Sequence, residues 1–223
     1  MKLSRPQFER LLQEKCLVLS LIGMSNIGKT HWSKKLNSIG FRHFNCDDLI
    51  ESHLAPVLKK LGYSGIADVS RWLGRPYEGK FSVNQKKYLT LEKAVMENIF
   101  TRIKNCQKQN IVIDTTGSVA HAGGNICSKL KQCSLVVYIE ANENMKEEMF
   151  KKYLKKPKPV IFGDVFDIKK NETLKQALKR CYQELLNLRG ALYTEYADII
   201  IPRGAIERDM NARQLISIIG QSL

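Results

Sequence analysis

The segment Gly23-Met24-Ser25-Asn26-Ile27-Gly28-Lys29-Thr30 decides the fold of this chain, because it matches the pattern G-x-x-x-x-G-K-[ST] at every position. In such a loop the glycines let the backbone wrap closely around an anion, and successive N–H groups point at its oxygens. We expect Lys29 to reach the outer phosphates of a nucleoside triphosphate and the Thr30 hydroxyl to hold Mg²⁺. The segment therefore predicts a P-loop that binds ATP through residues 23–30.

The residues on either side of the loop agree with this interpretation. Residues 16–22 form a short apolar run typical of a buried parallel strand. Residues 29–38 have the pattern of a helix, and the positive end of its dipole would face the phosphates. The alternative is a plain glycine turn between a strand and a helix.

Strand-like and helix-like segments alternate along the rest of the chain, which predicts a parallel sheet with helices on both faces. We expect further strands at 41–46, 111–113, 135–139 and 198–201, and helices at 49–61, 89–104, 122–131, 143–154, 172–188 and 206–219. The predicted fold class is α/β, a P-loop NTPase fold with a five-stranded parallel sheet. We expect a single domain over residues 1–223, with an inserted, partly helical substrate-side region at 62–104 and a lid at 151–170.

Composition limits the class of protein. The 223 residues contain no apolar run long enough to span a membrane, and the first residues have no secretory pattern. Glu9 and Glu14 argue against a transit peptide. The six cysteines include no C-x-x-C pair and no histidine at zinc spacing, so we expect reduced thiols. These observations predict a cytoplasmic protein with no membrane partner, and we expect a monomer.

The formal charge of +14 is compatible with nucleic acid, an anionic membrane or small anionic ligands as partners. The densest basic cluster comprises Lys151, Lys152, Lys155, Lys156 and Lys158. It is not interleaved with aromatic residues, and it falls where a lid over phosphates would lie. This position favours nucleotide binding over nucleic acid, which the charge alone does not exclude. A solvated lysine face is the alternative.

Carboxylates follow two of the predicted strands, at the edge of the sheet where ligands bind in open α/β folds. Asp114 comes directly after residues 111–113 and is expected to hold magnesium through water. Asp47 is the better candidate for gripping a substrate hydroxyl and helping to remove its proton. Capping of a helix N-terminus is the alternative for Asp47 and Asp48, and capping of a turn is the alternative for Asp114.

Taken together, residues 16–202 resemble the shikimate kinase family of P-loop small-molecule kinases. The resemblance rests on the P-loop, on Asp47 followed by Ile50-Glu51, and on the glycine-containing turn after the third strand. Most of its specificity comes from residues 188–200, which resemble the family's ending of arginine-x-x-leucine-tyrosine-x-x-x-alanine-aspartate.

The resemblance implies roles for several residues. Asp47 matches the aspartate that holds the acceptor hydroxyls, and Arg189 matches an arginine that clamps the shikimate carboxylate. Lys158 matches the lid residue that neutralises the γ-phosphate during transfer, and Lys151 matches an arginine that packs over adenine. Gly117 ends the stretch that matches the glycines against the substrate ring. A surface or helix-end charge is the alternative for Arg189, and solvated side chains are the alternative for the lysines.

The chain also departs from the family pattern around the acceptor. Leu89 stands in place of a second arginine, and Thr115-Thr116-Gly117 replaces a triple glycine. Loss of one of two arginines on a carboxylate weakens binding by about 1.5–3 kcal/mol. Arg71 and Arg75 are the candidates to replace the missing arginine.

Both lid positions, 151 and 158, hold lysine where the family has arginine, so the bidentate geometry of arginine is lost. A further departure lies on the metal side of the site. Asn45 replaces the aspartate found two positions before Asp47, so Asp114 is the candidate to supply the missing carboxylate.

From the sequence we expect an ATP- and Mg²⁺-dependent kinase that phosphorylates a hydroxyl of a small polar acceptor, with shikimate as the first acceptor to test. ATP and a small hydroxylated substrate are the expected partners. The altered acceptor residues leave open an ATP-binding protein without kinase activity. The positive charge leaves open a nucleotide or polynucleotide kinase.

Overall fold

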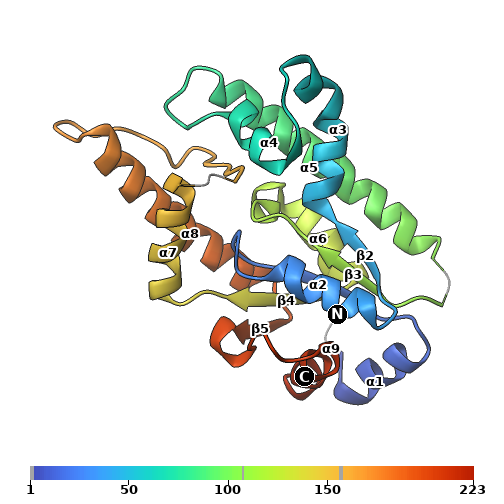
Figure 1. The fold of residues 1–223 in the computed structure, drawn as a ribbon. Coiled ribbons are helices and arrows are strands. Elements are labelled where there is room, and N and C mark those ends of the chain that lie inside the picture. The colour runs from blue at the N-terminus through green and yellow to red at the C-terminus, as the bar shows by residue number, and fades with distance from the viewer. Residues whose placement is uncertain (1–2, 107, 156–157) are drawn as a thin grey trace.

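The computed structural model describes residues 3–106, 108–155 and 158–223, and its centre is one parallel sheet of five strands in the order β2-β3-β1-β4-β5 (Figure 1). The strands are β1 (Val18–Ile22), β2 (Arg42–Asn45), β3 (Ile111–Asp114), β4 (Leu135–Glu140) and β5 (Ile199–Pro202). Every neighbouring pair runs parallel. The predicted five-stranded parallel sheet is confirmed.

Helices cover both faces of this sheet. They are α1 (Arg5–Gln13), α2 (Lys29–Ser38), α3 (Cys46–Lys60), α4 (Gly65–Leu73), α5 (Phe81–Lys104), α6 (Gly124–Cys133), α7 (Glu143–Lys155), α8 (Leu174–Tyr196) and α9 (Ala212–Gln221). Helix α2 contacts β1, β2, β3 and α9, whereas α6 and α8 contact β4 and each other. Among the described residues, none of the helices has the length and apolarity that crossing a membrane requires.

Helices α3, α4 and α5 contact one another and lie together at the top of Figure 1, beyond β2. The predicted first residues of α3 and α5 were wrong. Helix α3 begins at Cys46 rather than at residue 49, because Asn45 caps it. Helix α5 begins at Phe81 rather than at residue 89, because Phe81, Gln85 and Tyr88 continue its buried face. A polar residue, Gln85, conceals that helical spacing in the sequence.

The last two helices also differ from the prediction. Helix α8 continues to Tyr196 instead of ending at residue 188, since Arg189 and Tyr193 are buried on the same face as the earlier turns. Helix α9 begins at Ala212 rather than at residue 206, because Asn211 caps it and forms a capping box with Gln214.

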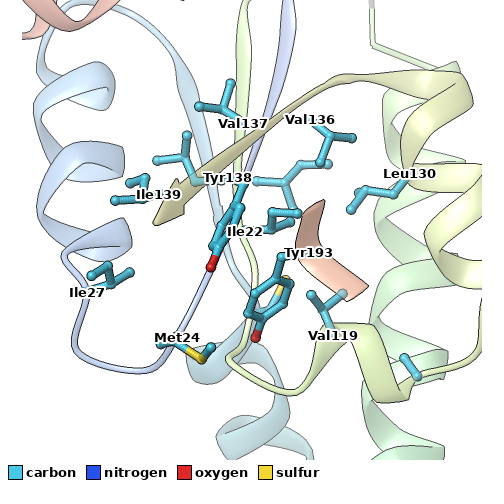
Figure 2. Packing of buried hydrophobic residues seen from close by; sticks show 14 of the residues in the cluster. Ile22, Met24, Ile27, Val119, Leu130, Val136, Val137, Tyr138, Ile139 and Tyr193 are labelled. Atoms are coloured by element: carbon cyan, nitrogen blue, oxygen red, sulfur yellow. The ribbon is translucent and has the colours of Figure 1, made fainter. Parts of the chain in front are cut away.

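Contacts between α8 and β4 position the turn that follows β3. The rings of Tyr138 on β4 and Tyr193 on α8 pack against each other (Figure 2), with their centroids 5.2 Å apart. The Tyr193 hydroxyl donates a hydrogen bond of 2.5 Å to the carbonyl oxygen of Gly117, in the turn after β3. The buried tyrosine pair therefore holds the turn at Gly117 in a defined position relative to β4.

Candidate functional site

The phosphate loop connects β1 to α2 and requires its glycines. Gly23 has φ of 139° and Gly28 has φ of 116°, values that side-chain-bearing residues rarely adopt. A Cβ atom at position 23 would also lie 2.7 Å from the carbonyl oxygen of Ile139. Helix α2 begins at Lys29, so its free N–H groups face the loop.

Lys29 lies beneath this loop and is only 6% exposed. Its Nζ donates hydrogen bonds to the carbonyl oxygens of Gly23 and Met24, at 2.9 and 3.1 Å. Burial lowers the pKa of Lys29, and the nearby carboxylates of Asp114 and Asp47 oppose that shift. The ammonium group is thus held against the first two residues of the loop, with two acidic neighbours.

A cavity of about 160 Å³ brings most of the predicted phosphate-side residues together. The loop after β1, the first turns of α2 and α3, the end of β3 and the segment after α7 all contribute. Its lining comprises Ser25, Asn26, Gly28, Lys29, Thr30, Asp47, Asp114, Thr115 and Lys158. The cavity therefore juxtaposes cationic, hydroxyl and carboxylate groups around a space of phosphate size.

Asp47 lies in the first turn of α3, with its carboxyl facing the cavity. Helix capping as the role of Asp47 and Asp48 was wrong, because Asn45 is the N-cap and accepts from both backbone N–H groups, at 3.1 and 3.3 Å. Asp48 is exposed and accepts a hydrogen bond of 2.7 Å from Asn45 Nδ2. Burial raises the pKa of Asp47, and Lys29 partly offsets this shift.

Asp114 ends β3 and is 2% exposed. Its register partner on β2 is Asn45, which stands where the family has an aspartate. The carboxylate of Asp114 therefore lies directly beside the position where that aspartate is absent. Among the described residues, no group of three or more His, Cys, Asp or Glu side chains is arranged to hold a metal ion. A magnesium ion here would rely on Thr30, Asp114, water and the nucleotide itself.

His43 also lies on β2 and was not among the predicted site residues. Its Nε2 is 3.6 Å from Asp114 Oδ2, and neither atom has a hydrogen-bond partner among the described residues. The available signal was strand alternation, which places His43 on the same face of β2 as Asn45.

Arg189 on α8 is buried, with 3% of its surface exposed. Its Nη2 donates a hydrogen bond of 2.6 Å to the carbonyl oxygen of Ile161, in the predicted lid. Its Nε is buried without a partner among the described residues. A surface charge was therefore the wrong alternative, and the buried Nε–H has no acceptor among the described residues.

Glu92 is a second buried ionisable residue that was not among the predicted site residues. It is 1% exposed and accepts hydrogen bonds from Thr116 and from Ser118, the latter at 3.0 and 3.1 Å. Burial raises the pKa of Glu92 from 4.5 to about 7, although these two hydroxyls oppose the shift. The signal available in the sequence was the pair of hydroxyl residues flanking Gly117.

Lys151 does not reach the cavity beside the P-loop. It is exposed, pairs with Glu148 at 2.9 Å and lines a groove between α7 and α8. The next residue, Lys152, lines instead a cavity of about 720 Å³ that shares Asn26 and Gly28 with the smaller one. Successive residues of a helix are rotated by about 100°, so Lys151 and Lys152 point in different directions. The resemblance to the family assigned the adenine contact to Lys151, which faces away from the larger cavity.

Arg71 and Arg75, the candidates to replace the arginine missing at Leu89, both have partners within the protein. Arg71 forms an exposed ion pair with Asp68 at 3.0 Å. Arg75 lies over the ring of Tyr153, 4.4 Å from its centroid, and donates to the Tyr153 carbonyl oxygen.

The segment after α7 is docked onto the protein at several points. Residues 160–162 are buried, and Gln85 bonds both the N–H and the carbonyl oxygen of Gly163, at 3.2 and 3.3 Å. Lys158 precedes this docked part and lines the small cavity. Residues 156 and 157, which belong to the predicted lid and include one lysine of the basic cluster, lie outside the described residues.

The sheet order, the glycine loop after β1 and the carboxylate at the end of β3 define a P-loop α/β fold. The chain is similar to shikimate kinase from Acinetobacter baumannii, solved with shikimate, at 21% identity and a TM-score of 0.56, covering 96% of this chain and 95% of that one. It is similar to shikimate kinase from Bacteroides thetaiotaomicron (13%, TM-score 0.52, 92% and 97%) and to the Deinococcus radiodurans tunicamycin resistance protein (13%, TM-score 0.50, 92% and 95%). No family model and no curated protein matches the chain. The predicted shikimate kinase-like fold is confirmed.

Proposed function

We propose that this protein is an ATP- and Mg²⁺-dependent small-molecule kinase that transfers the γ-phosphoryl group to a hydroxyl of a small polar acceptor. The observation that carries the proposal is the convergence of Lys29, Asp47, Asp114 and Lys158 on one cavity above the phosphate loop. Phosphoryl transfer needs cations around the moving group and a carboxylate beside the attacking oxygen.

The nucleotide would lie along the P-loop with its phosphates on the amides of residues 23–30. The larger cavity adjoins this loop through Asn26 and Gly28, which supports it as the place of the nucleoside. Its lining includes Met145, Met149 and Lys152, which offer apolar surface for a base and a cation for phosphate.

The residues present fit a magnesium ion. Asp114 and Thr30 line the same cavity, so a carboxylate and a hydroxyl group meet there. Carboxylate and hydroxyl oxygens are the ligands that Mg²⁺ prefers. When bound, the ion neutralises negative charge on the β- and γ-phosphates. Thr30 and Asp114 are the residues that would hold it.

Asp47 would orient the acceptor hydroxyl and accept its proton as the oxygen attacks the γ-phosphorus. Lys29 and Lys158 would stabilise the charge of the transferring group. Arg189 would bind an acceptor oxygen through its unpaired Nε. Shikimate is the first acceptor to test, because residues 16–202 resemble that family, although Leu89 and Thr116 alter the acceptor side.

The test is calorimetric binding of a non-hydrolysable ATP analogue with Mg²⁺, first alone and then with shikimate, followed by a phosphoryl-transfer assay with ATP. Lys29→Met should weaken analogue binding tenfold to a hundredfold, about 1.5–3 kcal/mol for a lost charged hydrogen bond, and abolish transfer. Lys34→Met, exposed on the same helix, is the control and should match the wild type.

The outcomes separate the candidates. Binding strengthened by shikimate supports a ternary complex with that acceptor. Binding indifferent to shikimate would direct the assay to other hydroxylated acceptors, and binding without transfer to any of them would favour a nucleotide-binding protein without kinase activity. No binding of the analogue, or full transfer by Lys29→Met, would overturn the proposal.

A further inference from the structure

The contact between His43 and Asp114 is unused by the proposed mechanism. Their facing atoms, His43 Nε2 and Asp114 Oδ2, are 3.6 Å apart. Both atoms are buried, and neither has a hydrogen-bond partner among the described residues. Such groups are rarely left unpaired in a folded protein, because each has given up its hydrogen bonds to water. Two of them facing each other point to a pair that closes when the site is filled.

Strand geometry explains why the two side chains meet. Asn45 is the register partner of Asp114, and His43 is the register partner of Val112. Alternate residues of a strand share a face, so His43 and Asp114 lie diagonally on one face of the β2–β3 pair. A histidine side chain is long enough to cross this diagonal, and the exposed fraction of its side chain is only 14%.

The chemistry of the pair follows from the atoms involved. A neutral imidazole that carries its proton on Nε2 donates one hydrogen bond, and a carboxylate accepts on either oxygen. Donation to Oδ2 would fix the rotation of the Asp114 carboxylate and leave its other oxygen for a metal-bound water. Hydrogen-bonded partners of this kind typically change metal affinity by about 10–100-fold when they are removed.

We propose that His43 is a positioning residue that orients the Asp114 carboxylate and thereby sets the affinity of the nucleotide site for Mg²⁺. This inference rests on the proposed function, since it concerns the same metal site. It adds a residue on β2 that does not itself line the small cavity and that faces one of the residues that do, Asp114. The position also explains how a site with Asn45 keeps one well-oriented carboxylate.

The test compares His43→Met, which keeps length and apolar volume but removes the donor, with His43→Gln, whose amide nitrogen replaces Nε2. Calorimetry measures binding of a non-hydrolysable ATP analogue over a range of Mg²⁺ concentrations and also without the metal. His43→Met should raise the half-saturating Mg²⁺ concentration about tenfold or more, and His43→Gln should restore most of the wild-type value. Binding without metal should stay within about twofold of wild type in both variants.

A merely structural role for His43 predicts a different pattern. In that case both variants would weaken binding equally with and without Mg²⁺, and that result would overturn the inference. An unchanged Mg²⁺ dependence in His43→Met would overturn it as well. If the wild type binds the analogue with a Mg²⁺ dependence that His43→Met leaves unchanged, the positioning role fails and the proposed function stands. If the wild type binds no analogue at all, the proposed function fails.

A second measurement does not depend on the folding of a variant. In wild-type protein with ¹⁵N-labelled histidine, the His43 ring nitrogens can be followed by NMR in the complex with the ATP analogue. Adding Mg²⁺ should shift the Nε2 resonance while its proton is retained. A His43 signal that does not respond to Mg²⁺ would contradict the role assigned to it.

Discussion

Gly117, in the turn after β3, lies directly against Ser25 of the phosphate loop. A Cβ atom at position 117 would be 2.5 Å from Ser25 Oγ and 3.0 Å from Ser25 N. The same glycine accepts the hydrogen bond from Tyr193 through its carbonyl oxygen. Gly117 therefore contacts both α8 and the loop that is proposed to bind phosphate, and there is no room for a side chain at position 117.

Gly117→Ala is expected to push Ser25 outward and to distort the loop. We predict nucleotide affinity about tenfold lower and a free energy of unfolding lower by about 1–3 kcal/mol, the usual effect of overpacking. Calorimetry with the ATP analogue and chemical denaturation measure the two effects. Unchanged nucleotide affinity in a folded Gly117→Ala would show that the contact does not shape the loop.

The control for this prediction is Ser25→Ala, which removes the hydroxyl nearest to the added Cβ. In the double variant, nucleotide affinity should recover in part, because the 2.5 Å contact disappears while the 3.0 Å contact with the Ser25 backbone remains. Strict additivity of the two substitutions would argue that the residues act independently.

Asp47→Asn should abolish the proton acceptor while leaving the shape of the site intact. We predict that kcat falls about 10²–10⁴-fold, the usual contribution of a general base, while affinity for the ATP analogue changes little. The neighbouring Asp48→Asn is a matched control, since Asp48 is exposed and bonded to Asn45 instead of facing the cavity. Equal losses of kcat in the two variants would exclude a special role for Asp47.

Glu92→Gln should change how stability depends on pH. The folded-state pKa of Glu92, about 7, lies above its ordinary value of 4.5, because burial disfavours the charged form. Its neutral form therefore contributes stability that is fully present below about pH 4.5 and is lost as pH rises through about 7. The loss amounts to about 3 kcal/mol in the free energy of unfolding, and Glu92→Gln should remove it.

The measurement is chemical denaturation of wild type and Glu92→Gln between pH 4.5 and 8. The difference between the two curves isolates Glu92 from other titrating groups. Glu97→Gln on the same helix is the control, because the Glu97 side chain is 46% exposed and pairs with Lys129 at the surface. Parallel curves for wild type and Glu92→Gln would contradict the prediction.

Lys158→Met should lower kcat by about tenfold to a hundredfold, since one cation facing the transferring group is lost. Affinity for ATP should fall less, because the P-loop amides and Lys29 remain. Lys170→Met, which removes an exposed lysine further along the same segment, is the control. A similar kcat for both variants would show that Lys158 is a solvated side chain with no role in phosphoryl transfer.

Local patterns in the sequence predicted much of the fold. The apolar run before Gly23 and the spacing after Gly28 gave β1 to within two residues of its start, and gave α2 with the boundaries Lys29–Ser38 found in the structure. The reason is that strand and helix periodicities, and the backbone freedom of glycine, act over a few neighbouring residues. Helix ends were missed where a polar buried residue, such as Gln85 or Arg189, continued an apolar face.

By itself, therefore, the sequence determined the P-loop, the alternation of strands and helices, and the two carboxylates near strand ends, Asp114 at the end of β3 and Asp47 just after β2. Only the tertiary structure decided that Asn45 lies beside Asp114, that His43 faces the same carboxylate, and that Glu92 pairs with the hydroxyls around Gly117. It also turned Lys152 rather than Lys151 toward the phosphate loop. These relationships depend on strand register and helix rotation, which are set by core packing between segments distant in the chain, so local patterns in the sequence do not specify them.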